Sequence, residues 1–214
     1  MKIGVFDSGK GGTTILEEIK KILPNEEYLF VGDSKNCPYG EKTDSELMEI
    51  VIDIVERLKK WGAKIIVVAC NTATAKCINR LRKLYPEIKF VGTEPAIRLA
   101  AKTDAKRVLV MATPGTIKSE RIEKLLKNNR KLGQDITLLA CPGLADAIEK
   151  GQNVKAILKK ILVGESQYDC VVLGCTHYSL IKSKIQKFFP QAELIDGNVG
   201  VANRVKELKL LVEK

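Results

Sequence analysis

Two short apolar runs in this chain each end in a cysteine that is followed by small polar residues. Residues 65–69 are aliphatic and lead into Cys70, and residues 170–174 are apolar or glycine and lead into Cys175. A short, continuous apolar run is typical of a parallel strand that is buried on both faces. Ligands bind at the carboxyl ends of such strands in open α/β sheets. The sequence therefore predicts that two equivalent strands deliver two thiols to a binding site.

Strand and helix signals alternate along the whole chain, which predicts an α/β fold of parallel sheets covered by helices. The helical pattern is most regular over residues 44–61, and Gly62 suits the C-terminal cap of that helix. The expected strands cover residues 3–6, 28–31, 65–69, 89–91, 108–112, 137–140, 170–173 and 193–195; the expected helices cover residues 14–22, 44–61, 116–129, 153–163, 179–189 and 198–214, with a further helix after residue 71.

The two cysteine segments also match in register. Cys175 follows Cys70 by 105 positions, and Thr113 follows Ser8 by the same 105 positions. Any two α/β halves share a coarse pattern, but two matching turns favour an internal duplication. We therefore expect two similar parallel-sheet αβα domains, related by pseudo-symmetry, with the active site in the cleft between them. The predicted first domain comprises residues 1–95 and 197–214, its terminal helix packing back on it, and the second comprises residues 96–196.

The charge and composition of the chain argue against a nucleic-acid-binding, membrane-spanning, secreted or metal-binding protein. The formal net charge is +10, yet the lysines are spread along the helices and only 5% of residues are aromatic, so we expect no nucleic-acid partner. No apolar run approaches the roughly 20 residues of a membrane span, and the first residues predict a strand rather than a signal peptide. The six cysteines form no C-x-x-C pair, so we expect no metal site and reduced thiols in a cytoplasmic protein.

A glycine-rich turn joins the first strand to the first helix, from Asp7 to Thr14. Free backbone amides at such a turn form an anion site. A phosphate-binding loop would need a lysine after its last glycine, whereas Lys10 precedes the glycine pair at residues 11–12, so nucleotide binding is not favoured. A carboxylate fits the turn equally well. Asp7 can accept a hydrogen bond from a thiol or an ammonium, although the commoner role of such an aspartate is to cap the turn.

Each of the two cysteines begins a polar triplet, Cys-Asn-Thr at residues 70–72 and Cys-Thr-His at residues 175–177. One interpretation is a buried cysteine followed by an ordinary helix N-cap. The other is a thiol at a helix N-terminus, where the dipole favours the thiolate and lowers a pKa that starts near roughly 8.5. His177, the single histidine of the chain, can then act with Cys175 in nucleophilic attack or proton transfer.

Three further segments carry polar groups that have a functional and an ordinary interpretation. The loop of Tyr39 and Gly40 can hold a carboxylate, or it is a plain surface loop. Thr113 and Thr116 place two hydroxyls at another strand-to-helix turn, with the same ambiguity. Glu149 stands near an expected helix end, and taken alone it is interpreted as a solvated charge.

The order and content of these motifs resemble the glutamate racemases, within the aspartate/glutamate racemase superfamily. The resemblance runs from residue 3 to about residue 178 and so spans most of the chain. The Pro-Tyr-Gly loop and the Asp-Ser-Gly start favour the glutamate branch over the aspartate branch. The matching segments are Gly4–Gly12, Gly32–Asp33, Pro38–Gly40, Ala69–Ala73, Glu94–Pro95, Ala112–Thr116 and Gly174–Tyr178.

The resemblance implies a cofactor-independent isomerase that interconverts L- and D-glutamate and supplies D-glutamate for peptidoglycan. Cys70 and Cys175 are implied as the two bases, one removing the α-proton and the other donating a proton to the opposite face. Asp7 and His177 are implied as assisting groups, with Glu149 a weaker candidate beside His177. The implied substrate contacts are Asp7, Ser8, Tyr39, Gly40, Asn71, Thr72, Thr113, Thr116, Thr176 and His177.

The chain departs from the family pattern in three places. The stretch between Glu149 and Gly174 is trimmed, Ser179 stands where the family usually has proline, and residues 142–146 are less bulky than usual. These differences concern Glu149 and the packing of the second domain, and both thiols remain in place. Family members commonly dimerise, so the resemblance also allows a homodimer.

Other functions fit parts of the pattern. A racemase of another amino acid, such as aspartate, would differ in the length of its side-chain pocket. A thiol hydrolase would use Cys175 and His177, form a covalent acyl intermediate and leave Cys70 dispensable. A non-catalytic anion-binding protein would tolerate the loss of both thiols. Only a racemase needs two thiols in matched positions, and we therefore favour it.

Overall fold

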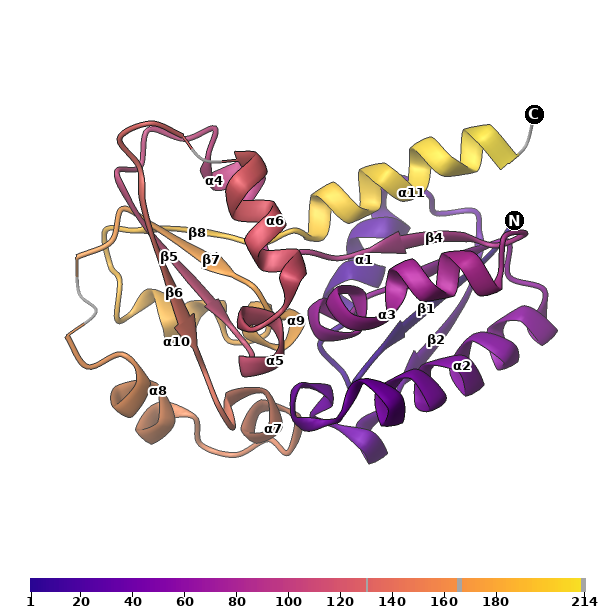
Figure 1. The fold of residues 1–214 in the computed structure, drawn as a ribbon, viewed down its shortest axis with the longest axis horizontal. Helices are drawn as coiled ribbons and strands as arrows, with labels where there is room; N and C mark the ends of the chain where they lie inside the picture. The colour runs from indigo at the N-terminus through magenta and orange to yellow at the C-terminus, as the bar shows by residue number, and fades with distance from the viewer. Residues whose placement is uncertain (130, 165–166, 213–214) are drawn as a thin grey trace.

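The computed structural model describes residues 1–129, 131–164 and 167–212, and within them the strands form two four-stranded parallel sheets. Figure 1 shows the sheets side by side, each with helices packed against it. The predicted α/β architecture is confirmed. The first sheet has the strand order β2-β1-β3-β4 and consists of β1 (Lys2–Asp7), β2 (Glu27–Gly32), β3 (Ile65–Val68) and β4 (Lys89–Gly92). The second sheet has the strand order β6-β5-β7-β8 and consists of β5 (Arg107–Ala112), β6 (Asp135–Ala140), β7 (Cys170–Leu173) and β8 (Glu193–Ile195).

The two sheets repeat each other with the offset expected from the cysteines. β5 begins and ends 105 positions after β1, and β7 begins and ends 105 positions after β3. The pairing repeats as well, because Ile3 lies opposite Ile65 in the first sheet and Val108 lies opposite Cys170 in the second. The predicted pseudo-symmetry is therefore confirmed. β3 and β7 have neighbours on both sides and are buried throughout, which explains their uninterrupted apolar sequences.

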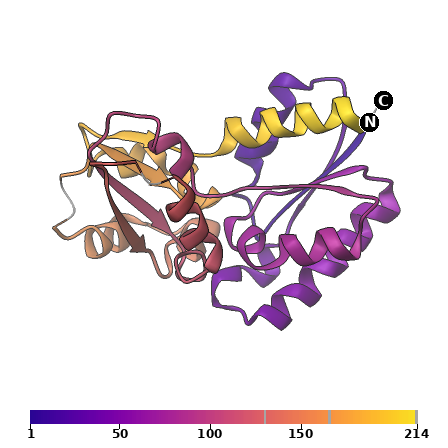
Figure 2. The ribbon, with the colours of Figure 1, turned by 45° about the horizontal axis from the view of Figure 1, so that its top comes forward.

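Apolar helix faces cover both sides of the first sheet. α2 (Asp44–Trp61) and α3 (Asn71–Leu84) pack on one side, and α1 (Thr13–Ile22) and α11 (Asn198–Val212) pack on the other. The Asn198 side chain donates a hydrogen bond to Thr14 Oγ1 at 3.1 Å. Figure 2 shows α11 lying along the first half as the chain returns to it. The terminal helix thus packs on the first half, as expected. Its predicted last residues, 213–214, lie outside the described part of the chain. The domain boundaries themselves stay a prediction.

The second sheet is covered by shorter helices. Within the described residues, α4 (Ile97–Ala100) and α6 (Glu120–Asn129) pack on one side, and α7 (Leu144–Glu149), α8 (Lys155–Ile161), α9 (Thr176–Ser179) and α10 (Lys182–Gln186) pack on the other. Two 3₁₀ turns, η1 (Ser34–Asn36) and η2 (Tyr39–Glu41), lie between β2 and α2. None of the helices in the described ranges has the length and apolar character needed to cross a membrane.

One expected helix is divided in the structure, and two others are shorter than expected. The helix predicted over residues 116–129 is α5 (Pro114–Ile117) followed by α6. The cause is Ser119, whose Oγ donates to the Thr116 carbonyl at 2.7 Å and accepts from the Ile122 amide at 3.3 Å. Such a hydroxyl competes with the helical hydrogen bonds on both sides. The helix predicted over residues 179–189 is the shorter α10, preceded by α9, and the helix predicted over residues 153–163 is the shorter α8.

Gly62 ends α2 in the left-handed conformation, with φ of 97°. A Cβ at Gly62 would meet only Lys2 Cδ, at 3.5 Å, so a side chain there costs backbone strain alone. We expect Gly62→Ala to lower the free energy of unfolding by about 1–2 kcal/mol, measured by urea denaturation. Gly200→Ala is the comparison, because Gly200 lies in α11 with nothing within 4 Å of its Cβ position, and alanine should raise the stability there. A Gly62→Ala protein as stable as the wild type would contradict the prediction.

Candidate active site

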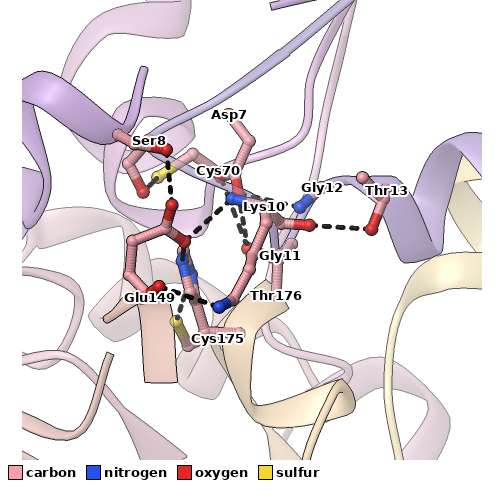
Figure 3. Close-up of polar contacts among 12 residues, drawn as sticks. Asp7, Ser8, Lys10, Gly11, Gly12, Thr13, Cys70, Glu149, Cys175 and Thr176 are labelled. Carbon is pink, nitrogen blue, oxygen red and sulfur yellow. Dashed lines mark hydrogen bonds and ion pairs between the residues drawn. The ribbon is translucent and has the colours of Figure 1, made fainter. Parts of the chain in front are cut away.

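The two thiols lie at the carboxyl ends of β3 and β7, where each strand turns into a helix. Cys70 is the N-cap residue of α3, and Cys175 is the N-cap residue of α9. The two residues are only 5% and 7% exposed. Both thiols lie beside the glycine-rich turn of the first half: Cys70 Sγ contacts Ser8 Oγ, and Cys175 Sγ faces His177, whose backbone nitrogen lies against Gly11. Figure 3 shows both thiols among the polar side chains that join the two halves.

The glycine-rich turn of the first half packs directly against the second half. A Cβ on Gly11 would lie 2.6 Å from the backbone nitrogen of His177 and 2.8 Å from the carbonyl carbon of Thr176. A Cβ on Gly9 would lie 2.4 Å from Oε2 of Glu149. Neither glycine has a positive φ, so both are needed for close approach rather than for backbone freedom. The turn therefore brings the two strand ends together.

Asp7 ends β1 and is fully buried where the halves meet. Its Oδ2 accepts a hydrogen bond from the Gly12 amide at 2.8 Å, and Thr176 Oγ1 lies 3.4 Å from both carboxylate oxygens. Burial raises the pKa of Asp7, although His177 and the amides of the turn act in the opposite direction. Asp7 thus holds the turn, as the ordinary interpretation expects, and it also faces the second half.

Cys70 has two polar neighbours from the first half. Its Sγ donates to Ser8 Oγ at 3.7 Å. Burial, followed by the charge of Asp7, raises the pKa of Cys70 to about 12. The predicted lowering of the pKa at the helix N-terminus is therefore wrong for this arrangement. The Ala73 amide does act in the expected direction, but burial of a charge is the larger effect.

Cys175 faces a histidine and, through it, a carboxylate. Cys175 Sγ lies 4.0 Å from His177 Nδ1, and His177 Nε2 lies 2.8 Å from Glu149 Oε2. Burial raises the pKa of Cys175, with Cys70 and Asp7 acting in the same direction. His177 itself is 1% exposed. The structure therefore joins the predicted thiol and imidazole of the second half in one buried chain.

Glu149 is not the solvated charge that its sequence neighbourhood indicates. Its side chain is only 10% exposed, and its carboxylate accepts hydrogen bonds from the Lys10 amide at 2.9 Å and from Ser34 Oγ. Burial raises the pKa of Glu149, but the hydrogen bonds from Ser34, Lys10 and His177 outweigh it and the net direction is downward. The interpretation from sequence was wrong because Lys10 and Ser34 come from the other half of the chain and His177 comes from a later segment of the same half.

Three threonines bridge the halves on another side of the site. Thr72 Oγ1 lies 2.9 Å from Thr113 Oγ1 and 3.3 Å from Thr116 Oγ1, and the last two are 3.1 Å apart. All three residues are buried. The hydroxyls satisfy one another here, so they form a polar cluster that a carboxylate can enter by exchanging partners.

The remaining predicted contacts are placed less directly. Tyr39 is buried, and its hydroxyl donates to Asp33 Oδ2 at 2.7 Å. Gly40 packs against Thr113, whose Cβ lies 3.3 Å from the Cβ position of the glycine. Asn71 is a buried residue at the first position of α3. The structure thus brings the Pro-Tyr-Gly loop to the threonine cluster, with the Tyr39 hydroxyl already engaged.

Lys10 and Ser34 contact Glu149, a role that the sequence did not indicate, whereas Asp33 lies in a segment that matches the family pattern and accepts a hydrogen bond from the Tyr39 hydroxyl. Lys10 holds Glu149 from 139 positions away, and Ser34 holds it from 115 positions away. The polar residues at positions 33 and 34 are a signal in the sequence, but no local pattern identifies Glu149 as the partner. Among the residues that the structure describes, no group of three or more histidine, cysteine or acidic side chains is arranged to hold a metal ion.

Gly11 gives a direct test of the contact between the halves. A methyl group there overlaps the backbone of His177, and overpacking of this kind costs about 1–3 kcal/mol, which favours the separated arrangement. We expect Gly11→Ala to raise the rate at which Cys70 and Cys175 react with a maleimide by roughly tenfold or more. Peptide mapping by mass spectrometry measures each thiol separately. Unchanged labelling in a folded Gly11→Ala protein would contradict this account, and Gly200→Ala is the control.

Comparison with known proteins is consistent with this geometry. The family model described as Asp/Glu/Hydantoin racemase matches residues 3–205. A glutamate racemase of Clostridium novyi (strain NT) is 39% identical over 222 residues, covering 100% of this chain and 85% of that protein.

Solved structures match over the same extent. The Escherichia coli glutamate racemase, in complex with L-glutamate and the activator UDP-MurNAc-ala, matches with a TM-score of 0.88 and 33% identity, covering 97% of this chain and 81% of that chain. The glutamate racemase of Francisella tularensis subsp. tularensis, in complex with D-glutamate, matches with a TM-score of 0.83 and 28% identity, covering 99% and 82%. The resemblance predicted from the motifs is confirmed.

Proposed function

This chain belongs to the Asp/Glu/Hydantoin racemase family, and we propose that it interconverts L- and D-glutamate by passing protons between glutamate and the thiols Cys70 and Cys175. The observation that carries the proposal is the placement of two buried thiols at the ends of equivalent strands of two duplicated sheets. The relatives that match over the full chain support glutamate as the substrate.

The reaction follows from two bases on opposite faces of one carbon. The first thiolate removes the α-proton, and the electron pair of that C–H bond remains on the α-carbon. The second thiol then donates its proton to the opposite face, which inverts the centre and leaves a thiolate in its place. Because the α-proton is very weakly acidic, the carbanion needs a dry site with fixed hydrogen-bond donors.

Each thiol has its own assisting groups. On one side, Ser8 accepts from Cys70 and the buried carboxylate of Asp7 is near enough to raise its pKa, so Asp7 is placed to take the thiol proton. The raised pKa of Asp7 makes it a better proton acceptor than an exposed aspartate. On the other side, His177 stands against Cys175 and is oriented by Glu149. Each thiol thus has a proton acceptor beside it, Asp7 for Cys70 and His177 for Cys175, so that a thiolate can form at the site where substrate binds.

Binding of glutamate uses the polar groups at the strand ends. We assign the two carboxylates to the hydroxyls and amides of Ser8, Asn71, Thr72, Thr113, Thr116 and Thr176, which are all buried where the halves meet. Tyr39 and Gly40 close the side of the site formed by the threonine cluster. Since both thiols are nearly inaccessible in this arrangement, the halves separate to admit substrate and close again for the reaction.

The cellular role follows from the product. D-glutamate is a building block of peptidoglycan, so we infer that this isomerase serves cell wall biogenesis and cell shape. The proposed chemistry needs both thiols reduced, which fits a reducing compartment such as the cytoplasm. A homodimer stays a prediction that sedimentation of the purified protein tests.

Exchange of the α-proton tests the two-thiol assignment. We expect the wild-type protein to convert L- to D-glutamate in D2O without added cofactor, and deuterium should replace the α-proton. The loss of the α-proton signal is measured by NMR. Cys70→Ala and Cys175→Ala should each abolish conversion. Cys170→Ala is the matched control, because Cys170 begins the same strand that leads to Cys175 and should leave the rate unchanged.

The alternatives predict other outcomes of the same experiment. A Cys175–His177 hydrolase would keep its activity in Cys70→Ala and would not exchange the α-proton. A wild-type protein that neither racemises nor exchanges glutamate would contradict the assignment, and aspartate would then be tested in the same way.

The proton acceptors beside the thiols predict the pH dependence of the reaction. Both thiol pKa values are raised, so each thiol stays protonated in the free enzyme until its proton passes to an assisting group such as Asp7. Because Asp7 must be ionised to take that proton and its own pKa is raised, we expect kcat/KM to rise with pH as Asp7 ionises and then to level off. A profile that keeps rising tenfold for each pH unit up to about pH 9 would mean that the thiol proton is lost to solvent, and would contradict the role of Asp7.

A further inference from the structure

Glu149 belongs to the second half of the molecule, yet most of its partners belong to the first. The Lys10 amide donates to its Oε2 at 2.9 Å, the Lys10 ammonium donates to its backbone carbonyl at 2.8 Å, and Ser34 Oγ donates to its Oε1. Figure 3 shows Lys10 reaching Glu149 across the boundary between the halves. Because these contacts join the two halves, separation of the halves would break them.

The same carboxylate also holds the group that faces Cys175. Its Oε2 lies 2.8 Å from His177 Nε2, and the other ring nitrogen lies 4.0 Å from Cys175 Sγ. Glu149 therefore links two residues of the first half to a thiol of the second. The carboxylate also lies against Gly9, where a Cβ would come within 2.4 Å of its Oε2.

The Cys70 side has no counterpart of this chain in the part of the protein that the structure describes. The residue that follows Cys70 by two positions, as His177 follows Cys175, is Thr72. Thr72 bonds to the hydroxyls of Thr113 and Thr116 instead of to a carboxylate. Closure of the halves is thus linked to Cys175 through Glu149 and His177, and the described part of the first half has no equivalent pair of residues beside Cys70.

We propose that Lys10 and Ser34 are positioning residues for Cys175, which grip Glu149 when the halves close and so fix His177 against this thiol. The proposal rests on the proposed function. It assigns a role to a lysine within the glycine-rich turn and to a serine of η1, and neither touches the reacting atoms. Cys70, served by Asp7 and Ser8 of its own half, does not depend on them.

Racemisation alone cannot reveal this asymmetry. The enantiomers have equal free energies, so kcat/KM must be equal in both directions for every variant. A one-base reaction is needed, and glutamate with chlorine on its β-carbon provides one. When a thiolate removes the α-proton, the C–H electron pair forms a double bond to the β-carbon and chloride leaves. The resulting enamine hydrolyses to 2-oxoglutarate and ammonia, so each enantiomer reports on one thiol.

The experiment measures this elimination from both enantiomers in Lys10→Met, Ser34→Ala and the double variant. Cys70→Ala and Cys175→Ala first identify which enantiomer each thiol serves. The matched controls are Lys64→Met at the amino end of β3 and Ser45→Ala in α2, both exposed residues away from the site. Lys10→Arg, which keeps the cation, is the conservative variant.

We expect elimination by Cys175 to fall on the order of tenfold to a hundredfold in the double variant, since small misplacements of a catalytic group have effects of this size. Elimination by Cys70 should stay within about twofold of the wild type, and Lys10→Arg should restore much of the loss. Equal losses for both enantiomers, or no loss in either, would overturn the proposal. If the wild type neither racemises glutamate nor eliminates chloride, the proposed function fails instead.

Discussion

The site depends on one contact, the packing of the turn at residues 9–12 on the peptide between Thr176 and His177. Because Gly11 has no side chain, the backbone of the first half approaches the backbone of the second as closely as two chains allow. This contact sets Asp7 beside Thr176 and brings the ends of β3 and β7 to one place. Without it, each thiol would sit at the end of its own sheet with no opposing partner.

Much of this arrangement could be predicted from the sequence, because the signals are local. Apolar runs identify β3 and β7, the 105-residue offset identifies the duplication, and the cysteines mark the strand ends. Three features could not be predicted. The grip on Glu149 joins residues more than a hundred positions apart, the hydroxyl of Ser119 divides a helix that periodicity makes continuous, and burial reverses the expected pKa shift of the thiols.

The duplicated scaffold presents two thiols in equivalent places but gives them different surroundings. Cys70 has an acceptor hydroxyl and a buried carboxylate from its own half, whereas Cys175 has an imidazole whose orienting carboxylate is held by the other half. A reaction with two mirror-image substrates needs a base on each face of the α-carbon, but the two bases do not need the same assisting groups. Because only Cys175 depends on a carboxylate held by the other half, closure of the halves positions this thiol alone.

The central claim is that one thiol removes the proton and a different thiol replaces it. The most direct measurement follows protiated L-glutamate as it reacts in D2O. At early times the two enantiomers are separated, and the deuterium content of each is measured by mass spectrometry. The account predicts deuterium in the newly formed D-glutamate while the remaining L-glutamate stays protiated. Equal deuterium in both enantiomers from the start would mean that a single base serves both faces, and would contradict it.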